Sequence, residues 1–347
     1  MLKYINYIVV FLTLISYLAS YLSPNNAWPI AFISIFYPWF LLFNLLFIAY
    51  WGYKKNKLAF LSIFTLLIGY QHIFGFVNFG KEVESKSASI KIMTYNLAGL
   101  SILNNKNKAE ELAALSSFIK SQSCDLLCFQ EFIIGEAAVK QLASKLKLDD
   151  FPYRNSIKDK AVIIFSKYPL TNNNQIFFDP PGNGFIYSDI TTINNKKARI
   201  FCGHFHSSTV STNANRLANE AEGGNLDREM AVIELKGMLG KFRNTSKIRA
   251  NEAENLAFEL KRSPYPNIVC CDLNETPQSY AYHLISKYLI DGFKEVGAGI
   301  GTTYNGVIPA LRIDYIFASP KFPFSSYQIS NVKFSDHYPV IASIQIP

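Results

Sequence analysis

Three long apolar runs occupy most of the first 80 residues. They cover positions 4–22, 30–51 and 58–76, and a Gln-His pair interrupts the third near its end. Each run is close to the ~20 residues that an α-helix needs to cross a bilayer. A cleaved signal peptide is the alternative for the first run, but two further runs follow it and no convincing small-residue cleavage site appears. The pattern therefore predicts a membrane anchor of three transmembrane helices over residues 1–80, with a turn at 23–29.

Beyond a short polar linker at 81–89, the apolar segments become shorter. Strands are predicted at 90–97, 125–131, 160–166, 185–193, 197–202, 268–271, 311–317 and 340–346. Helices are predicted at 108–122, 136–145, 230–239, 248–260 and 279–288, and a flexible loop at 297–301. The mixture predicts an α/β (α+β) domain over residues 90–347.

Eight polar residues interrupt or end these strands. They are Asn96, Glu131, His204, Asp272, Asn274, Asp314, Asp336 and His337. Strands of one sheet bring such positions together at one edge, and residues two apart on extended chain point the same way. Carboxylates and amides without a cysteine cluster favour a hard cation, Mg²⁺ first and Mn²⁺ or Ca²⁺ after it. Together with imidazoles that donate or transfer protons, they are the parts of a phosphoester-hydrolysing site.

Each of these residues also has an ordinary structural explanation when it is taken alone. Asp272 is expected to close an Asx turn after its strand, and Asn96 to sit in a turn. Glu131 at the end of an apolar strand requires either a paired cation or a bound metal ion. A lone histidine on an apolar face is usually a satisfied core residue, but His204 and His206 stand together with two serines. The functional interpretation therefore rests on the whole set.

The net charge bears on the class of substrate. The formal net charge is +8, and four of the positive charges belong to lysines in residues 1–80, which leaves +4 for 81–347. This is compatible with a phosphate-bearing substrate but does not require one. The charged segment at 209–263 is expected to be mostly a solvated helix face.

The five cysteines lack zinc spacing and are expected to be small buried side chains, with no disulfide predicted. No Gly-rich phosphate loop and no Gly-x-Ser-x-Gly motif is present.

The lysines of the first 80 residues indicate an orientation. They fall on one side of a three-helix arrangement: Lys3, Lys54, Lys55 and Lys57. The positive-inside rule places these lysines in the cytoplasm, and an odd number of spans then places the rest of the chain outside it. We expect a multi-pass protein of the cell (inner) membrane, with its α/β domain extracytoplasmic and its residues 1–80 in contact with the lipid bilayer.

Six stretches in this order resemble the endonuclease/exonuclease/phosphatase superfamily, in the manner of its deoxyribonucleases and sphingomyelinases. They are Thr94-Tyr-Asn96, Phe129-Gln-Glu131, Gly203-His204-Phe205, Cys271-Asp-Leu-Asn-Glu-Thr-Pro277, Arg312-Ile-Asp-Tyr-Ile316 and Ser335-Asp-His-Tyr-Pro339. The resemblance covers residue 90 to the C-terminus. It implies a two-sheet β-sandwich with helices outside. Two departures, Cys271 in place of a glycine and Cys202-Gly203 in place of Asn-Thr, remove no catalytic side chain.

The resemblance also implies roles. Glu131 would be the main metal ligand, with Asn96 and Asp336 near the metal. Asp272 would orient or deprotonate the attacking water, and Asn274 would hold the phosphate. Asp314 would pair with His337, and His204 would stabilise the transition state or protonate the leaving group.

The implied activity is that of a metal-dependent phosphodiesterase or phosphatase. Its substrate would be a phosphate ester, which leaves open a nucleic acid, a lipid headgroup or a small phosphodiester, and no obligate protein partner is evident. The alternative is a catalytically silent module on the same fold that binds or senses a phosphorylated ligand. A transporter is poorly supported, because the apolar runs contain no acid and a single histidine.

Overall fold

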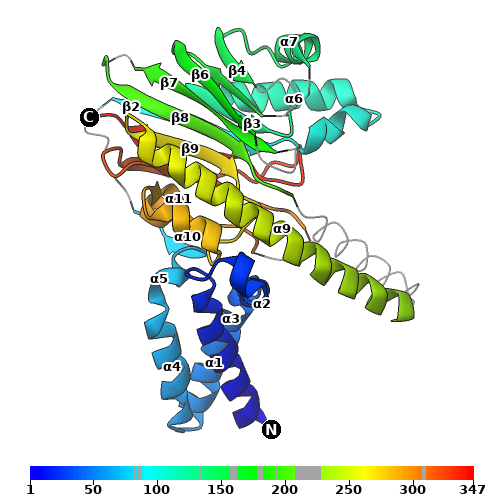
Figure 1. Cartoon of the computed structure of the whole chain (residues 1–347), viewed down its shortest axis with the longest axis vertical. Helices are drawn as coiled ribbons and strands as arrows, with labels where there is room; N and C mark the ends of the chain where they lie inside the picture. The colour runs from blue at the N-terminus through cyan, green and yellow to red at the C-terminus, as the bar shows by residue number, and fades with distance from the viewer. Residues whose placement is uncertain are drawn as a thin grey trace.

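The computed structural model describes residues 1–81, 83, 88–132, 135–156, 162–177, 183–192, 194–207, 228–306 and 310–347. Within these ranges, a group of N-terminal helices joins a domain of two six-stranded sheets (Figure 1). Much of the expected linker at 81–89 lies outside the described residues, as do residues 209–227 of the charged segment at 209–263 and the first residues of the strand expected at 160–166.

Two sheets form the body of the α/β domain. The first has the order β10 (Ile290–Asp291), β12 (Asp314–Ala318), β9 (Asn267–Asp272), β8 (Lys197–His204), β7 (Gly184–Thr191) and β6 (Leu170–Phe177). The second has the order β13 (Phe324–Ile329), β14 (Val340–Gln345), β2 (Ser89–Asn96), β3 (Leu126–Gln130), β5 (Ile163–Ser166) and β4 (Tyr153–Ser156). In each sheet one central pair, β8–β9 or β2–β3, is parallel, and the other pairs are antiparallel. The two-sheet sandwich implied by the sequence is confirmed.

The core between the sheets follows from strand alternation. Every second residue of a strand faces the same way, and these inner positions carry small or branched apolar side chains. On β2 and β3 they include Ile90, Ile92, Leu126 and Cys128, and on β8, β9 and β12 they include Ile200, Cys202, Ile268, Cys270 and Ile316. All five cysteines are buried, as the sequence predicted.

Helices cover the outer faces of both sheets. On the second sheet, α6 (Lys108–Ser121) and α7 (Glu136–Lys145) pack through Leu115, Ile119 and Leu142, after the 3₁₀ segment η1 (Ala98–Asn104). On the first sheet, α10 (Tyr280–Ser286) lies beside the long helix α9 (Arg228–Arg262), while α11 (Gly292–Val296) adds Phe293 to the core between the sheets. The two helices expected within 230–260 are one continuous helix.

The N-terminal region is mainly helical up to Ile73. It contains α1 (Leu2–Leu18), α2 (Pro24–Ser34), α3 (Tyr37–Tyr53), α4 (Leu58–Ile68) and α5 (Tyr70–Ile73). The start of a kinked helix replaces the simple turn expected at 23–29. The Ser23 hydroxyl accepts from the Asn25 amide, and Pro24 occupies the first helical turn, so α2 begins there. The backbone leaves the helical conformation at Ala27 (φ −142°, ψ 46°), so the chain does bend within the expected turn.

The helix lengths do not support three single transmembrane spans. Among the helices that the structure describes, none is by itself both long and apolar enough to cross a bilayer. Helices α2 and α3 meet the length and composition criteria only as a pair, across a bend of 47°. The predicted run at 30–51 is thus divided at this bend, because Pro38 starts a second helix in its first turn.

The helical region is fixed to the sandwich by several buried contacts. Strand β1 (Val77–Phe79) pairs with β11 (Ala298–Ile300), so the flexible loop expected at 297–301 is wrong. The Arg312 guanidinium, which is fully buried, donates to the Gly75 carbonyl at 2.8 Å and forms an ion pair with Asp291. These contacts hold the segment around Gly301, which continues into the candidate site.

Candidate active site

The strand register gathers most of the predicted polar residues at one end of the sandwich. Asp272 lies at the end of β9, directly opposite His204 of β8 on one side and Asp314 of β12 on the other. In the second sheet, Asn96 ends β2 and Glu131 follows β3. Four of these side chains occupy the same inner positions as the apolar core, so the interior of the sandwich ends in a polar cluster.

Asn96 connects the two sheets. Its Nδ2 donates to Glu131 Oε1 at 3.1 Å and to Asp272 Oδ2 at 2.9 Å. Its own oxygen accepts from the Ala98 amide at 2.9 Å. Both Asn96 and Asp272 are fully buried, and two carboxylates so close together require such a donor or a cation between them. The amide of Asn96 therefore orients the two acids.

His204 faces the same pair of acids. Its Nε2 lies 3.5 Å from Glu131 Oε1 and 3.6 Å from Asp272 Oδ2. The Asn274 Nδ2 is 3.4 Å from the same ring nitrogen and also donates to the Phe205 carbonyl. The Asn274 backbone N–H donates to Asp272 Oδ1, and this hydrogen bond forms the Asx turn expected from the sequence. The structural and functional interpretations of this stretch are therefore compatible.

Asp314 and His337 form a buried pair, as the sequence resemblance implied. His337 Nδ1 lies 2.9 Å from Asp314 Oδ2, and its Nε2 lies 3.9 Å from Asp272 Oδ2. Burial disfavours the charged imidazole, but the carboxylates of Asp314 and Asp272 outweigh it and raise the pKa of His337. Tyr304 packs its ring edge-on against His337 at 5.2 Å. The pair thus presents an oriented, proton-bearing Nε2 toward Asp272.

Glu131 and Asp336 are the two more accessible acids. The Glu131 side chain is 37% exposed, and its backbone has a φ of +48°, a region that residues other than glycine rarely adopt. Asp336 is exposed and held through its backbone, since its carbonyl accepts from the Asn305 amide at 2.7 Å. Within the described residues, no hydrogen bond joins the Asp336 carboxylate to Glu131 or Asn96. Contacts therefore link seven of the eight predicted residues, and Asp336 lies exposed beside them, where its charge helps to raise the pKa of His337.

The donor set fits a hard divalent cation. Asp272, Asp314 and His337 lie within 4.8 Å of one another, but Asp314 and His337 are already occupied by their mutual hydrogen bond. The remaining oxygens, those of Glu131 and Asp272, converge on the Asn96 amide, and oxygen donors of this kind are what Mg²⁺ binds. Asn96 would hold such a cation indirectly unless its amide turned, because its nitrogen faces the acids.

A second layer of charge behind the cluster was missed by the sequence interpretation. Arg249 of α9 donates to Glu275 Oε1 at 2.7 Å and to the His206 carbonyl at 3.0 Å. Glu252, one turn later, accepts from the His206 amide at 2.8 Å. Burial raises the pKa of Glu252 to about 7, although the His206 amide and Arg249 oppose the shift. Arg249 and Glu252 therefore connect α9 to His206, which follows His204, and to Glu275, which follows Asn274.

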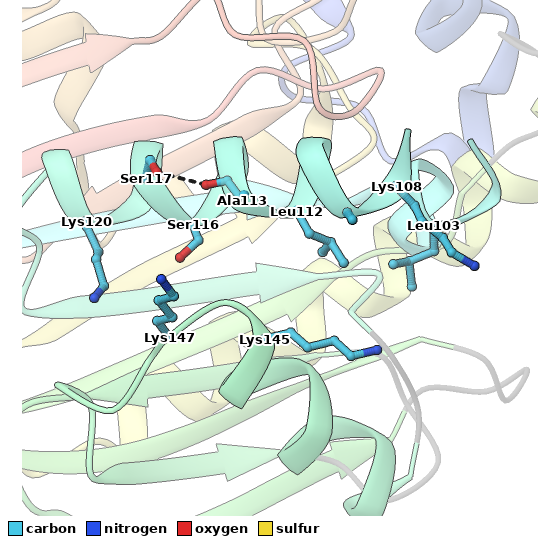
Figure 2. A pocket seen from close by; sticks show the side chains of 10 residues that line it. Leu103, Lys108, Leu112, Ala113, Ser116, Ser117, Lys120, Lys145 and Lys147 are labelled. Carbon is cyan, nitrogen blue, oxygen red and sulfur yellow. Dashed lines mark hydrogen bonds between the residues drawn. The ribbon is translucent and has the colours of Figure 1, made fainter. Parts of the chain in front are cut away.

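A cavity near the outer helices is a separate feature. It has a volume of about 640 Å³ and lies between α6 and the end of α7, where Leu103, Leu112 and four lysines line it. Figure 2 shows these side chains. The cavity contains no carboxylate and no histidine, and none of the eight predicted residues lines it. The candidate active site is therefore identified by its chemistry and not by the volume of a cavity.

Known proteins place this domain in a family. A model of the endonuclease/exonuclease/phosphatase family matches residues 93–337, and a model of a domain of unknown function matches residues 1–76. None of the curated protein sequences matches the chain significantly.

Solved structures share the fold at low identity. The human nocturnin catalytic domain, solved with bound sulfate, is 15% identical with a TM-score of 0.53, and the alignment covers 76% of this chain and 96% of that one. A family member from Bacteroides thetaiotaomicron is 16% identical with a TM-score of 0.52 and coverages of 76% and 99%. A mannosyl-6-phosphatase from the same organism is 16% identical with a TM-score of 0.50 and coverages of 74% and 100%. At these identities the likeness concerns the fold, whereas the family model spans more than half of the sequence, and the chain therefore belongs to the endonuclease/exonuclease/phosphatase family.

Proposed function

We propose that the protein is a divalent-metal-dependent phosphoester hydrolase in which Asp272 activates a water molecule. The observation that carries this proposal is the contact of Asp272 with Asn96, Asn274 and His204 at the end of the sandwich. Members of the family are hydrolases that act on phosphoester bonds. The cluster supplies a base, amide donors and two imidazoles, which are the groups that such a reaction needs.

Each side chain has a role that its contacts suggest. The Asn96 side chain donates to Asp272 Oδ2 and the Asn274 backbone N–H donates to Oδ1, so both carboxylate oxygens are held in place, and a remaining lone pair would orient or deprotonate water. Asn274 and the Nε2 of His337 are positioned to donate to phosphate oxygens. His204 lies beside both acids and would give a proton to the departing alcohol. A cation held by Glu131 would neutralise charge on the phosphate. The silent binding module remains the alternative, but no group of the predicted set is lost.

Hydrolysis of simple phosphate esters tests this proposal. The full chain, purified in detergent, should hydrolyse bis-p-nitrophenyl phosphate or p-nitrophenyl phosphate in the presence of Mg²⁺, and EDTA should abolish the turnover. Replacement of Asp272 by Asn should lower the rate by ~10²–10⁴-fold while leaving the melting temperature within a few degrees. Asp149→Asn, at an exposed acid away from the site, serves as the matched control. An Asp272→Asn variant as active as the control would exclude the proposed mechanism.

We also propose that the N-terminal helices lie in a bilayer. Their arrangement is inverted relative to a water-soluble bundle. Six side chains packed inside it are polar and nearly inaccessible: Asn6, Thr13, Ser16, Asn44, Ser62 and Thr65. Several bond one another, as in the Asn6–Ser62 and Asn44–Thr13 contacts of 2.9 Å. Large apolar side chains such as Phe11, Leu46 and Phe64 are 55–61% exposed. Small and polar residues inside with apolar residues outside are typical of helices surrounded by lipid.

The positions of the lysines support one orientation in such a bilayer. Lys3 stands at the start of α1, and Lys54, Lys55 and Lys57 lie in the loop between α3 and α4. Figure 1 shows both places at the end of the helices that is remote from the sandwich. The positive-inside rule would place that end in the cytoplasm and the catalytic domain outside it.

A further inference from the structure

The helical region comes close to the candidate active site at the bend between α2 and α3. Ile35, at this bend, packs against a small apolar cluster formed by Tyr304, Leu311 and Ile313. Tyr304 pairs with His337 through the backbone and packs its ring against the imidazole. The adjoining Thr303 hydroxyl accepts from the Asp314 amide at 3.1 Å. Only one layer of side chains therefore separates the end of the helical region from two catalytic residues.

Helix α9 also contacts α2. Phe242 packs its ring against Phe32 of α2 at 5.4 Å, and the Arg243 guanidinium lies 6.0 Å from the Trp28 ring. Figure 1 shows α9 passing α2 at the end of the helices nearest the sandwich, while the start of α9 projects beyond them. Residues 233–247 hold four basic residues and one acid, a net charge of +3, and Lys236, Lys241 and Arg243 are exposed. Two apolar side chains of the same stretch, Ile233 and Leu235, are 62% and 52% exposed.

This mixture of residues suits the surface of a bilayer. Exposed apolar and aromatic side chains continue around the same end of the helices: Tyr21, Leu22, Phe36 and Trp39. Aromatic rings gather at the level of lipid headgroups, and basic side chains beside them attract anionic lipids. A site that opened far from the bilayer would have no need of such a border. One residue of this end of the helices, Ile35, packs on Tyr304, which contacts His337.

We propose that the substrate is the phosphodiester headgroup of a membrane lipid, hydrolysed while the lipid remains in the bilayer. This inference rests on the proposed hydrolase function and on the proposed place of the helices in a bilayer. In the reaction the oxygen of water forms a bond to phosphorus, and one ester P–O bond breaks. The proton from water passes to Asp272, and the departing alcohol oxygen takes a proton from His204. One product stays in the membrane, and the other is released into water.

The experiment uses the full chain in lipid nanodiscs of phosphatidylcholine, phosphatidylethanolamine and phosphatidylglycerol, with Mg²⁺. Mass spectrometry follows diacylglycerol, phosphatidic acid and the released headgroups, while bis-p-nitrophenyl phosphate reports turnover of a soluble ester in the same sample. We expect lipid products that are absent with Asp272→Asn. The double variant Lys241→Gln/Arg243→Gln should lower the ratio of lipid turnover to soluble-ester turnover by about fivefold. Lys261→Gln/Arg262→Gln, at the other end of α9, is the matched control and should leave that ratio unchanged.

The outcomes separate the two proposals. Turnover of the soluble ester without any lipid product would overturn the lipid substrate and leave the hydrolase function in place. If the two double variants changed the ratio equally, the proposed attraction of anionic lipids by Lys241 and Arg243 would be excluded. If the folded protein turned over neither the lipid nor the soluble ester, both the hydrolase function and the lipid substrate would be excluded.

Discussion

The two regions of this chain bury opposite kinds of residue. In the sandwich, the inner face of each strand is apolar until it reaches the candidate site, where Asn96, Asp272 and Asp314 replace the apolar residues. In the N-terminal helices, the packed interior contains Asn6 and Asn44. A side chain is sorted by the solvent around the fold, so the same rule that drives apolar residues inward in water drives polar residues inward in lipid. The difference supports the proposal that lipid surrounds the N-terminal helices and water surrounds the sandwich.

The buried polar groups also differ in what they do. In the helices, they bond to one another or to the backbone, as Thr13 does with the Val9 carbonyl, and they carry no formal charge. In the sandwich, the buried polar groups include acids and histidines whose ionisation depends on their neighbours. The first kind holds helices together, and the second kind provides chemistry. Three measurements test this comparison, and they follow in order of the expected effect.

The largest contrast is expected in the accessibility of introduced cysteines. Because all five native cysteines are buried, single variants Lys145→Cys and Lys57→Cys can be labelled selectively with a membrane-impermeant maleimide. In intact cells Lys145→Cys, on the catalytic domain, should be labelled, and Lys57→Cys should react only after permeabilisation. Both positions are exposed, so burial does not explain a difference. The reverse pattern would exclude the proposed orientation.

Arginine substitutions should distinguish lipid from water as the solvent of each region. Phe64 in α4 is 61% exposed, and Phe177 at the end of β6 is 56% exposed. If α4 faces lipid, Phe64→Arg should cost ~3 kcal/mol and reduce the amount of protein recovered in the membrane fraction. Phe177→Arg should cost less than about 0.5 kcal/mol, because its side chain already faces water. Equal recovery of the two variants would contradict the lipid environment of α4.

One dependence of stability on pH should arise where α9 packs against the sandwich. The pKa of Glu252 is raised to about 7 from 4.5, so the folded protein keeps a proton that the unfolded chain releases. This stabilisation is complete below pH 4.5 and is lost as the pH rises through 7. Glu252→Gln, which mimics the protonated form, should therefore be more stable than the parent at pH 8 by roughly 1–3 kcal/mol, and similar to it at pH 5.

Thermal unfolding of the detergent-solubilised chain at the two pH values measures this effect. Glu254→Gln, at an exposed position of the same helix, provides the control and should show no such difference. A Glu252→Gln variant that gains nothing at pH 8 would show that the acid is ionised in the folded state.

The strand ends of the site were predictable because strands have a period of two. Once Cys270 and Ile316 are assigned to the core, Asp272 and Asp314 must point the same way, and the pairing of neighbouring strands brings them together. The burial of Arg249 and Glu252 was not predictable in this way. On a helix of mixed charge they resemble a solvated face, and only the fold shows that Ala253 and Leu256 turn this side toward the sheet. The β1–β11 pairing was missed because the glycines at 297–301 suggest a loop.

The pairing of Val77 with Ile300, together with the bond from Arg312 to the Gly75 carbonyl, has a consequence for how the protein is made. The ribosome releases residues 75–79 before almost all of the sandwich exists. At about 5–20 residues per second, the partners around 298–312 follow roughly 10–45 seconds later. During this interval strand β1 has no partner from β11. These contacts of residues 75–79 can therefore form only after most of the sandwich has been synthesised, while β12, β13 and β14 are still to follow.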